Sequence, residues 1–202
     1  MPVYGPSGNH SVPALPQYLA RLIGSKGAYA YLSGFLDGGE SFRLKPVTVA
    51  ADAAHPKVFA ASEGGFRISA VPVTHSIIPA LGWRVEKDGC AVVFSSSTSN
   101  MGRTLDKIAA DADLLVAHNA IPEGSTDRVV LKLHMMPSEI GRIAAAAHAK
   151  SVVLSHFMNR TENVMQETAA AIGSRYKGKL NFARDCDIYA VHSGEQIGSC
   201  LR

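Results

Sequence analysis

The chain has 202 residues, which is enough for one domain with a sizeable core and hardly enough for two. We therefore predict a single domain over residues 1–202. With 47% hydrophobic and 18% charged residues it is typical of a globular protein, and its net charge of +3 includes no basic block that would demand a nucleic-acid partner. No stretch approaches the roughly 18 apolar residues of a membrane span, and the N-terminus lacks the pattern of a signal peptide.

The three cysteines, Cys90, Cys186 and Cys200, lie far apart and show no CxxC spacing. Because three is an odd number, a complete set of disulfides is excluded, and a reducing compartment is the simpler interpretation. We therefore expect a cytoplasmic protein without membrane contact.

The first part of the chain predicts a turn-rich start followed by helices. Residues 1–10 concentrate Pro, Gly, Ser and Asn, which suits a loop or the end of a strand. Leucines at helical spacing predict a helix over 14–24, and a second helix is expected over 28–36. Residues 38–47 are expected to form a loop that leads into extended chain.

Strands dominate the next stretch. Residues 57–62 and 64–75 are expected to be strands joined by a Gly-Gly turn. The clearest hairpin pairs 82–86 with 90–95 across Lys87-Asp88-Gly89, because Asp-Gly provides the turn chemistry.

Helices and strands alternate in the remainder of the chain. Helices are expected over 104–112, 137–149 and 163–176, and strands over 113–118, 151–156 and 181–191. The run SVVLSH at 151–156 is continuously apolar, as in strands covered on both faces. Alternation of this kind predicts an α/β fold.

Three histidines follow predicted strands: His75, His118 and His156. In layered α/β folds, side chains at strand ends line the crevice where ligands bind. One such histidine alone would more often be structural, but three in one chain favour a metal site, since neutral imidazole is the commonest metal ligand in proteins.

His134 differs because it precedes a helix. A helix N-terminus disfavours the cationic form of a nearby histidine, which suits proton transfer near neutral pH, although an exposed loop histidine is an equal alternative. The remaining histidines show no comparable pattern and are expected on the surface: His10, His55, His148 and His192.

Two other chemistries find little support. The SSSTS segment at 95–99 has hydroxyls but no GxSxG elbow, so a serine hydrolase nucleophile is not predicted. The GPSGN segment at 5–9 lacks the Lys-Ser/Thr of a phosphate-binding loop.

Several segments together resemble metallo-β-lactamase-fold hydrolases of the ribonuclease Z-like and arylsulfatase-like branch. They are PVYGPSGN, THSIIPALGWRVEKDGCAVVFSSSTS, ADLLVAHNAIPEG and LHMMPSEIGRIAAAAHAKSVVLSHFMNRT. The resemblance implies an α/β fold equivalent to half of the four-layer αββα sandwich of that family. It also implies a metal-dependent hydrolase of ester or phosphodiester bonds, with two zinc ions in a complete family member.

Carried over to this chain, the resemblance makes His75 a ligand of the first metal and His156 a ligand of the second. It makes His134 the residue that assists proton transfer or stabilises charge on the substrate, and it leaves the role of His118 open. The short connection between Glu86 and Cys90 fits hydrolases of small esters better than ribonuclease Z.

Two departures from the family pattern stand out. The 202 residues contain no His-x-His-x-Asp-His motif, and Ser97 takes the place of the Asp that bridges the two metals. A neutral hydroxyl is a poor zinc ligand, whereas the carboxylate offsets much of the charge of the metals. Of the ligand side chains that the family uses, only His75 and His156 therefore remain.

Two hypotheses follow. The first is a truncated metal-dependent hydrolase, inactive as the isolated chain, that would act on a small-molecule ester or phosphodiester once completed. The second is a degenerate metallo-β-lactamase fold kept as a non-catalytic binding or assembly module. In either case we expect self-association, or a partner that covers the missing half.

Overall fold

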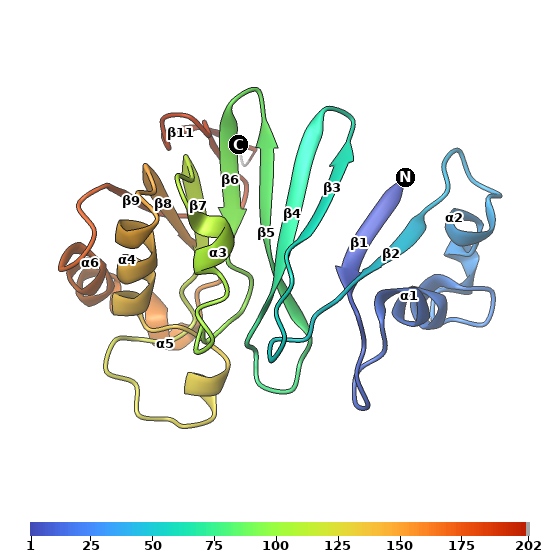
Figure 1. The fold of residues 1–202 in the computed structure, drawn as a ribbon, viewed down its shortest axis with the longest axis horizontal. Helices are drawn as coiled ribbons and strands as arrows, with labels where there is room; N and C mark the ends of the chain where they lie inside the picture. Colours follow the sequence, from blue (N-terminus) through green and yellow to red (C-terminus); the bar gives the residue numbers. More distant parts are fainter. Residues whose placement is uncertain (201–202) are drawn as a thin grey trace.

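The computed structural model describes residues 1–200 and is built around a seven-stranded sheet (Figure 1). The strands lie in chain order: β3 (Phe59–Glu63), β4 (Phe66–Val73), β5 (Ala80–Lys87), β6 (Cys90–Phe94), β7 (Leu114–His118), β8 (Ser151–Ser155) and β9 (Lys179–Phe182). Neighbours from β3 to β6 pair antiparallel, and neighbours from β6 to β9 pair parallel. The sheet is therefore mixed, and the predicted α/β class is confirmed.

Tight turns join the antiparallel strands. Asp88 and Gly89 have φ values of 51° and 78°, and Lys87 pairs with Cys90 across them, as the Asp-Gly signal predicts. Gly64 and Gly65 also have positive φ and join β3 to β4. Both predicted hairpins are confirmed.

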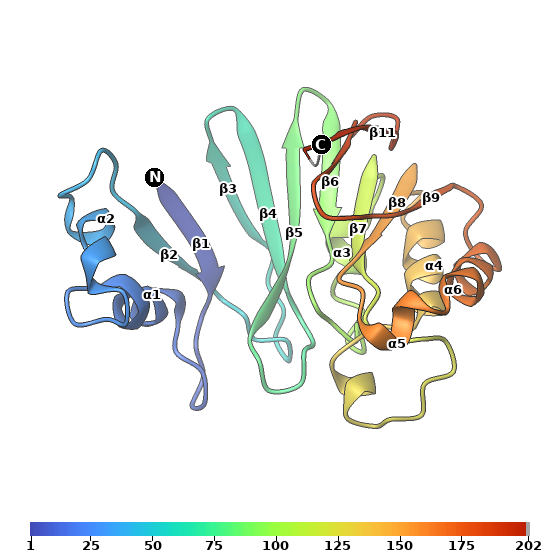
Figure 2. The same ribbon diagram turned by 180° about the vertical axis from the view of Figure 1, so that it is seen from behind.

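Helices connect the parallel strands. These are α3 (Asp106–Ala109), η2 (Val130–Lys132), α4 (Pro137–Ala146), α5 (Asn159–Glu162) and α6 (Met165–Gly173). The helices α3, α4 and α6 lie together over one face of the sheet (Figure 1, Figure 2). Gly141 of α4 makes this layer compact, because a Cβ there would lie 2.7 Å from the carbonyl oxygen of Ile172 in α6.

The main core fills the space between these helices and the sheet. Its largest fully buried side chains include Leu105, Leu115, Ile140, Leu154 and Ile172. The strand β8 is buried over its first four residues, which explains why its sequence is apolar without alternation.

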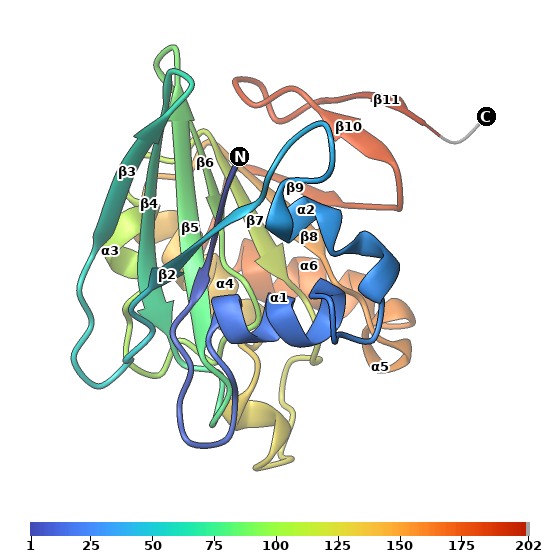
Figure 3. The ribbon, with the colours of Figure 1, turned by 90° about the vertical axis from the view of Figure 1, so that its right-hand side faces the viewer.

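A smaller layer lies on the opposite face of the antiparallel strands (Figure 3). It contains β1 (Pro2–Pro6) and β2 (Lys45–Val49), which pair parallel, together with α1 (Leu15–Ile23), η1 (Ala30–Leu32) and α2 (Gly34–Asp37). The ring of Tyr4 lies 5.4 Å from that of Phe59 and 6.4 Å from that of Trp83. A few aromatic contacts and a small core therefore join this layer to the sheet.

The C-terminal segment differs from prediction in two ways. The strand expected over 181–191 is interrupted after Phe182, where Arg184 and Asp187 form a turn with two hydrogen bonds. The strand β10 (Asp187–Tyr189) then pairs with β11 (Gln196–Ser199) in a separate sheet.

That hairpin brings Cys186 and Cys200 together in a disulfide, and Cys90 remains free. This disulfide does not fit the reducing compartment that the cysteine count suggested. An odd count excludes complete pairing but says nothing against a single pair. No helix within residues 1–200 is long and apolar enough to cross a membrane.

Candidate active site

Four strands of the central sheet point in the same direction and end at one edge. They are β4, β6, β7 and β8, since β4 and β6 both run antiparallel to β5 and the others run parallel to β6. His75 follows β4, Ser97 follows β6, His118 ends β7 and His156 follows β8. His134 joins them from the segment between η2 and α4. The topology of the sheet therefore brings five polar side chains together at this edge.

The four imidazole rings form a continuous cluster. Ring centroids are 5.4 Å apart for His75 and His134, 6.0 Å for His134 and His156, and 4.7 Å for His118 and His156. His134 thus lies between the two predicted metal ligands. The prediction that the strand-end histidines converge on one edge is confirmed.

Hydrogen bonds orient two of the rings. The Nδ1 of His75 lies 2.8 Å from the carbonyl oxygen of Leu133, and the Nδ1 of His118 lies 3.0 Å from the hydroxyl of Ser97. The Nδ1 of His134 is buried and has no hydrogen-bond partner in the described part of the chain. His156 has a positive φ of 58° and an exposed side chain at the rim of the cluster.

Burial and mutual repulsion keep the inner rings neutral. Burial, followed by the positive charge that neighbouring histidines would carry, lowers the pKa of His118 to about 4. The same causes lower the pKa of His134 to about 4. Near pH 7 both imidazoles are therefore neutral and can accept a proton.

A polar network anchors the loop that follows β6. Asn100 is 2% exposed, and its amide nitrogen donates to Glu139 (2.9 Å) and to Asp106 (3.3 Å). Arg142 forms ion pairs with the same two carboxylates. The network fixes the Ser97 loop against α4, and hydrogen bonds to Glu139 and Asp106 raise the pKa of Arg142. Sequence reasoning missed it, because its members lie far apart in the chain and match no motif.

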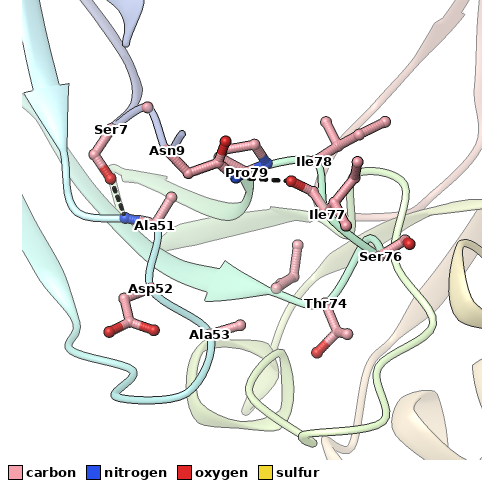
Figure 4. A pocket seen from close by; sticks show the side chains of 12 residues that line it. Ser7, Asn9, Ala51, Asp52, Ala53, Thr74, Ser76, Ile77, Ile78 and Pro79 are labelled. Atoms are coloured by element: carbon pink, nitrogen blue, oxygen red, sulfur yellow. Dashed lines mark hydrogen bonds between the residues drawn. The ribbon is translucent and has the colours of Figure 1, made fainter. Parts of the chain in front are cut away.

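Two cavities flank the cluster. One of about 380 Å³ adjoins His75 through Thr74, and its wall is held by a hydrogen bond from Asn9 to the carbonyl oxygen of Ile77 (Figure 4). The other, of about 600 Å³, includes His156 and is lined by charges of both signs, from Glu162, Arg184 and Asp185. The second cavity offers room beside His156 for a small molecule.

The residues present do not complete a two-zinc centre. Imidazole nitrogens suit zinc, and the unpartnered Nδ1 of His134 is a free donor atom of that kind. However, within residues 1–200 no three His, Cys, Asp or Glu side chains are placed so that they could hold a metal ion. The position at which the resemblance predicts a bridging Asp carries the hydroxyl of Ser97, which is already bonded to His118.

The other histidines lie apart from this site. The side chains of His55, His148 and His192 are 80–83% exposed, and His10 is also exposed. The prediction that all four are surface residues is confirmed.

Known proteins resemble most of this chain. Residues 17–157 match the family described as the beta-lactamase superfamily domain. Ribonuclease Z of Mycobacterium tuberculosis (strain H37Rv) is 26% identical over 137 residues, which cover 63% of this chain and 50% of that protein. The chain spans about half the length of the curated relatives it matches.

Solved structures show the same fold. The metallo-beta-lactamase fold protein YhfI from Bacillus subtilis has a TM-score of 0.64 at 18% identity, covering 91% of this chain and 61% of its own. The short form of human tRNase Z has a TM-score of 0.59 at 19% identity, with 91% and 65% coverage. Zinc-bound PqqB from Methylobacterium extorquens has a TM-score of 0.59 at 18% identity, with 92% and 63% coverage.

These likenesses confirm the predicted metallo-β-lactamase type of α/β fold, and the family match extends over more than half of the sequence. The chain belongs to the β-lactamase superfamily, and its sheet and histidine-bearing loops have the metallo-β-lactamase fold.

Proposed function

We propose that this chain forms one side of the active site of a metal-dependent hydrolase that cleaves ester or phosphodiester bonds. The observation that carries the proposal is the convergence of four imidazole rings at one edge of the sheet in a member of this superfamily. The superfamily includes hydrolases, and ribonuclease Z is among the relatives of this chain.

In this proposal His75 and His156 are metal ligands and His134 is the residue that moves a proton. His134 lies between the other two rings, and its lowered pKa leaves the ring neutral near pH 7. Zinc is the proposed metal, by analogy with zinc-bound PqqB, which shares the fold. Zinc ions in hydrolases supply activated water and polarise the scissile group.

We further propose that the 202 residues alone have no metal-dependent activity, because two inherited ligands are fewer than the three or four protein ligands of a typical zinc site. The test measures zinc content and turnover of an ester and a phosphodiester, with and without chelator. The unmodified chain should bind well below two zinc ions and show no chelator-sensitive turnover. Two tightly bound ions, or turnover that a chelator abolishes, would contradict the proposal.

The roles of the individual histidines can be tested in a protein to which the missing metal ligands have been added. Joining an upstream half that carries His-x-His-x-Asp-His and introducing Ser97→Asp should restore two zinc ions per chain, whereas Ser97→Asp alone should not. In the completed protein, His75→Gln or His156→Gln should lose zinc. His134→Gln should keep zinc and lower turnover by roughly 10²–10⁴-fold. The exposed His148→Gln serves as the matched control and should change neither.

The Ser97–His118 hydrogen bond favours a second candidate, a non-catalytic binding or assembly module. In this bond the hydroxyl of Ser97 and the imidazole of His118, two neutral groups, serve as each other's hydrogen-bond partners. The loop therefore needs no metal to be stable. If the completed protein with Ser97→Asp folds but binds no zinc, this second candidate replaces the first.

We also propose self-association, or a partner that covers apolar surface. Several large apolar side chains are exposed: Tyr18 and Tyr31 around α1 and η1, and Phe94 at the end of β6. Contiguous exposed apolar area usually marks an interface. Light scattering should find an oligomer, and a stable, monodisperse monomer would contradict this expectation.

A further inference from the structure

Ser97 and His118 form a hydrogen-bonded pair at the edge of the sheet where the histidines gather. The Ser97 hydroxyl lies 3.0 Å from the Nδ1 of His118, within the reach that a nucleophile and its general base require. We propose that Ser97 is a nucleophile and His118 its base, and that the pair accepts acyl groups from small carboxylic esters without a metal. This inference is independent of the proposed metal-dependent function.

Neighbouring bonds hold Ser97 in place from both sides. Before it, the backbone N–H of Ser95 donates to the carbonyl oxygen of Val116, and the hydroxyl of Ser95 accepts from the N–H of His118. After it, the hydroxyl of Thr98 donates to the carbonyl oxygen of Thr74. The serine loop is therefore tied to β7 and to the end of β4, so the approach of Ser97 to His118 is preorganised.

The pair and a metal site at His118 are alternatives. When the Ser97 hydroxyl donates to Nδ1, the neutral ring carries its proton on Nε2, which then has no lone pair for a metal. That assignment agrees with the geometry of the described residues, among which no three His, Cys, Asp or Glu side chains are placed so that they could hold a metal ion. The GxSxG motif is absent from the sequence, but it describes only nucleophiles on a strand–turn–helix elbow. Here two parallel strands assemble the pair instead.

The chemistry balances with water as the co-reactant. The Ser97 oxygen attacks the ester carbon while its proton moves to Nδ1 of His118. The carbon–oxygen bond to the alcohol then breaks, and the proton passes from His118 to the leaving oxygen. Water next adds to the acyl carbon and gives a proton to His118. Finally the bond between Ser97 and the acyl group breaks, and Ser97 recovers its proton from His118.

The surrounding charges favour an uncharged ester over an anionic phosphodiester. The cavity beside His156, whose ring lies 4.7 Å from that of His118, is lined by two carboxylates and one guanidinium, those of Glu162, Asp185 and Arg184. An additional negative charge on the substrate would therefore meet net repulsion there.

The experiment uses p-nitrophenyl acetate with the intact 202-residue chain in buffer that contains a chelator. We expect a burst of p-nitrophenol and one acetyl group per chain, located on Ser97 by peptide mass spectrometry. Acetylation at other residues only, or no acetylation of folded protein, would overturn the proposal. Because this result is obtained with the wild-type chain, it tests the role of Ser97 even if a variant fails to fold.

Variants separate the base from the nucleophile. Ser97→Ala should abolish the burst, and His118→Gln should slow acetylation of Ser97 by roughly 100-fold or more, because general base catalysis contributes at least that much. Ser25→Ala, at an exposed serine in the turn after α1, is the matched control and should acetylate at the wild-type rate. Equal rates in His118→Gln and wild type would overturn the role of the base. The p-nitrophenol burst and the acetylation of Ser97 are measured in the presence of a chelator, so they do not depend on the outcome of the zinc experiments. The two proposals can therefore fail separately.

Discussion

The two faces of the central sheet are covered in very different ways. On one face, α4 buries Pro137, Ile140, Gly141, Ile143 and Ala144 in a continuous core. On the other face, α1 has a more strongly one-sided apolar pattern in its sequence than α4, yet none of its nine residues is fully buried. A helix of that length gains its stability from the tertiary packing of its apolar face. The helix-covered layer therefore stabilises the chain, and the layer of β1, β2 and α1 adds less.

The candidate site is attached mainly to the stable layer. His118 and His156 end the buried strands β7 and β8, and His134 leads into α4. His75 follows β4, in which the consecutive residues Ala70 and Val71 face the small and the large core, respectively. The imidazole cluster should therefore keep its geometry even when the small layer loosens.

The largest difference between the layers should appear in core truncations. Ile140→Ala removes a side chain that is fully buried in the main core and should lower the free energy of unfolding by about 2–5 kcal/mol. Leu19→Ala, on the half-buried side of α1, should cost about 1 kcal/mol or less. Urea denaturation monitored by circular dichroism measures both. Equal losses would show that the two layers stabilise the fold equally.

Loss of a hydrogen-bonding side chain should also cost more in the helix-covered layer than beside the small layer, but the difference should be smaller than for the core truncations. Asn100→Ala removes a buried amide that donates to two carboxylates, and because hydrogen bonds to charged groups are strong it should cost about 1–3 kcal/mol. Asn9→Ala removes hydrogen bonds at an exposed loop beside the small layer, where water replaces them, so its cost should be about 1 kcal/mol or less. Thermal unfolding of the two variants tests this ranking, which would be wrong if Asn9→Ala were the more damaging.

The histidine cluster should make stability depend on pH. Burial, and then repulsion from the other histidines, lowers the folded pKa of His118 to about 4 from an ordinary 6.5. Between those pH values the unfolded chain binds a proton that the folded chain does not, so stability rises with pH through this window and is lost as pH falls. Because the ring is partly exposed to solvent, the effect should be on the order of 1–2 kcal/mol.

His118→Asn should therefore flatten the stability profile between about pH 6.5 and 4. His148→Asn is the control, because that ring is 82% exposed and Asn also tolerates its positive φ of 51°. Its profile should match that of the wild type. Parallel profiles for all three proteins would show that His118 titrates normally in the folded state.

Local sequence signals predicted most elements and the strand-end histidines, but not how long each element runs. The helix expected over 104–112 shortens to Asp106–Ala109, and Asp111 takes a positive φ. The helix expected over 28–36 divides into η1 and α2. Periodicity reports which side of a segment is apolar, whereas the end of a helix depends on tertiary packing that short-range patterns do not contain.

The site was predictable only where its residues carry a positional signal. Histidines at strand ends could be found, because parallel strands finish at a common edge. The bond between Ser97 and His118 could not, since it depends on the loop after β6 folding back toward β7. The Asn100 network was missed for the same reason, as its partners in α3 and α4 are distant in the sequence.

Substitutions at two glycines should have small effects of opposite sign. Gly173 lies at the end of α6 in the helical layer, and a Cβ there would meet no atom within 4 Å. Gly173→Ala should therefore raise the free energy of unfolding by about 0.5–1 kcal/mol, because alanine restricts the unfolded chain and favours helix. Gly89 also has open space around it, but its φ of 78° belongs to the left-handed region. Gly89→Ala should thus lower stability by about 1–2 kcal/mol. Chemical denaturation of both variants measures the pair. Neither substitution creates a steric clash. If both variants changed the free energy of unfolding in the same direction, backbone conformation would not explain the difference between the two positions.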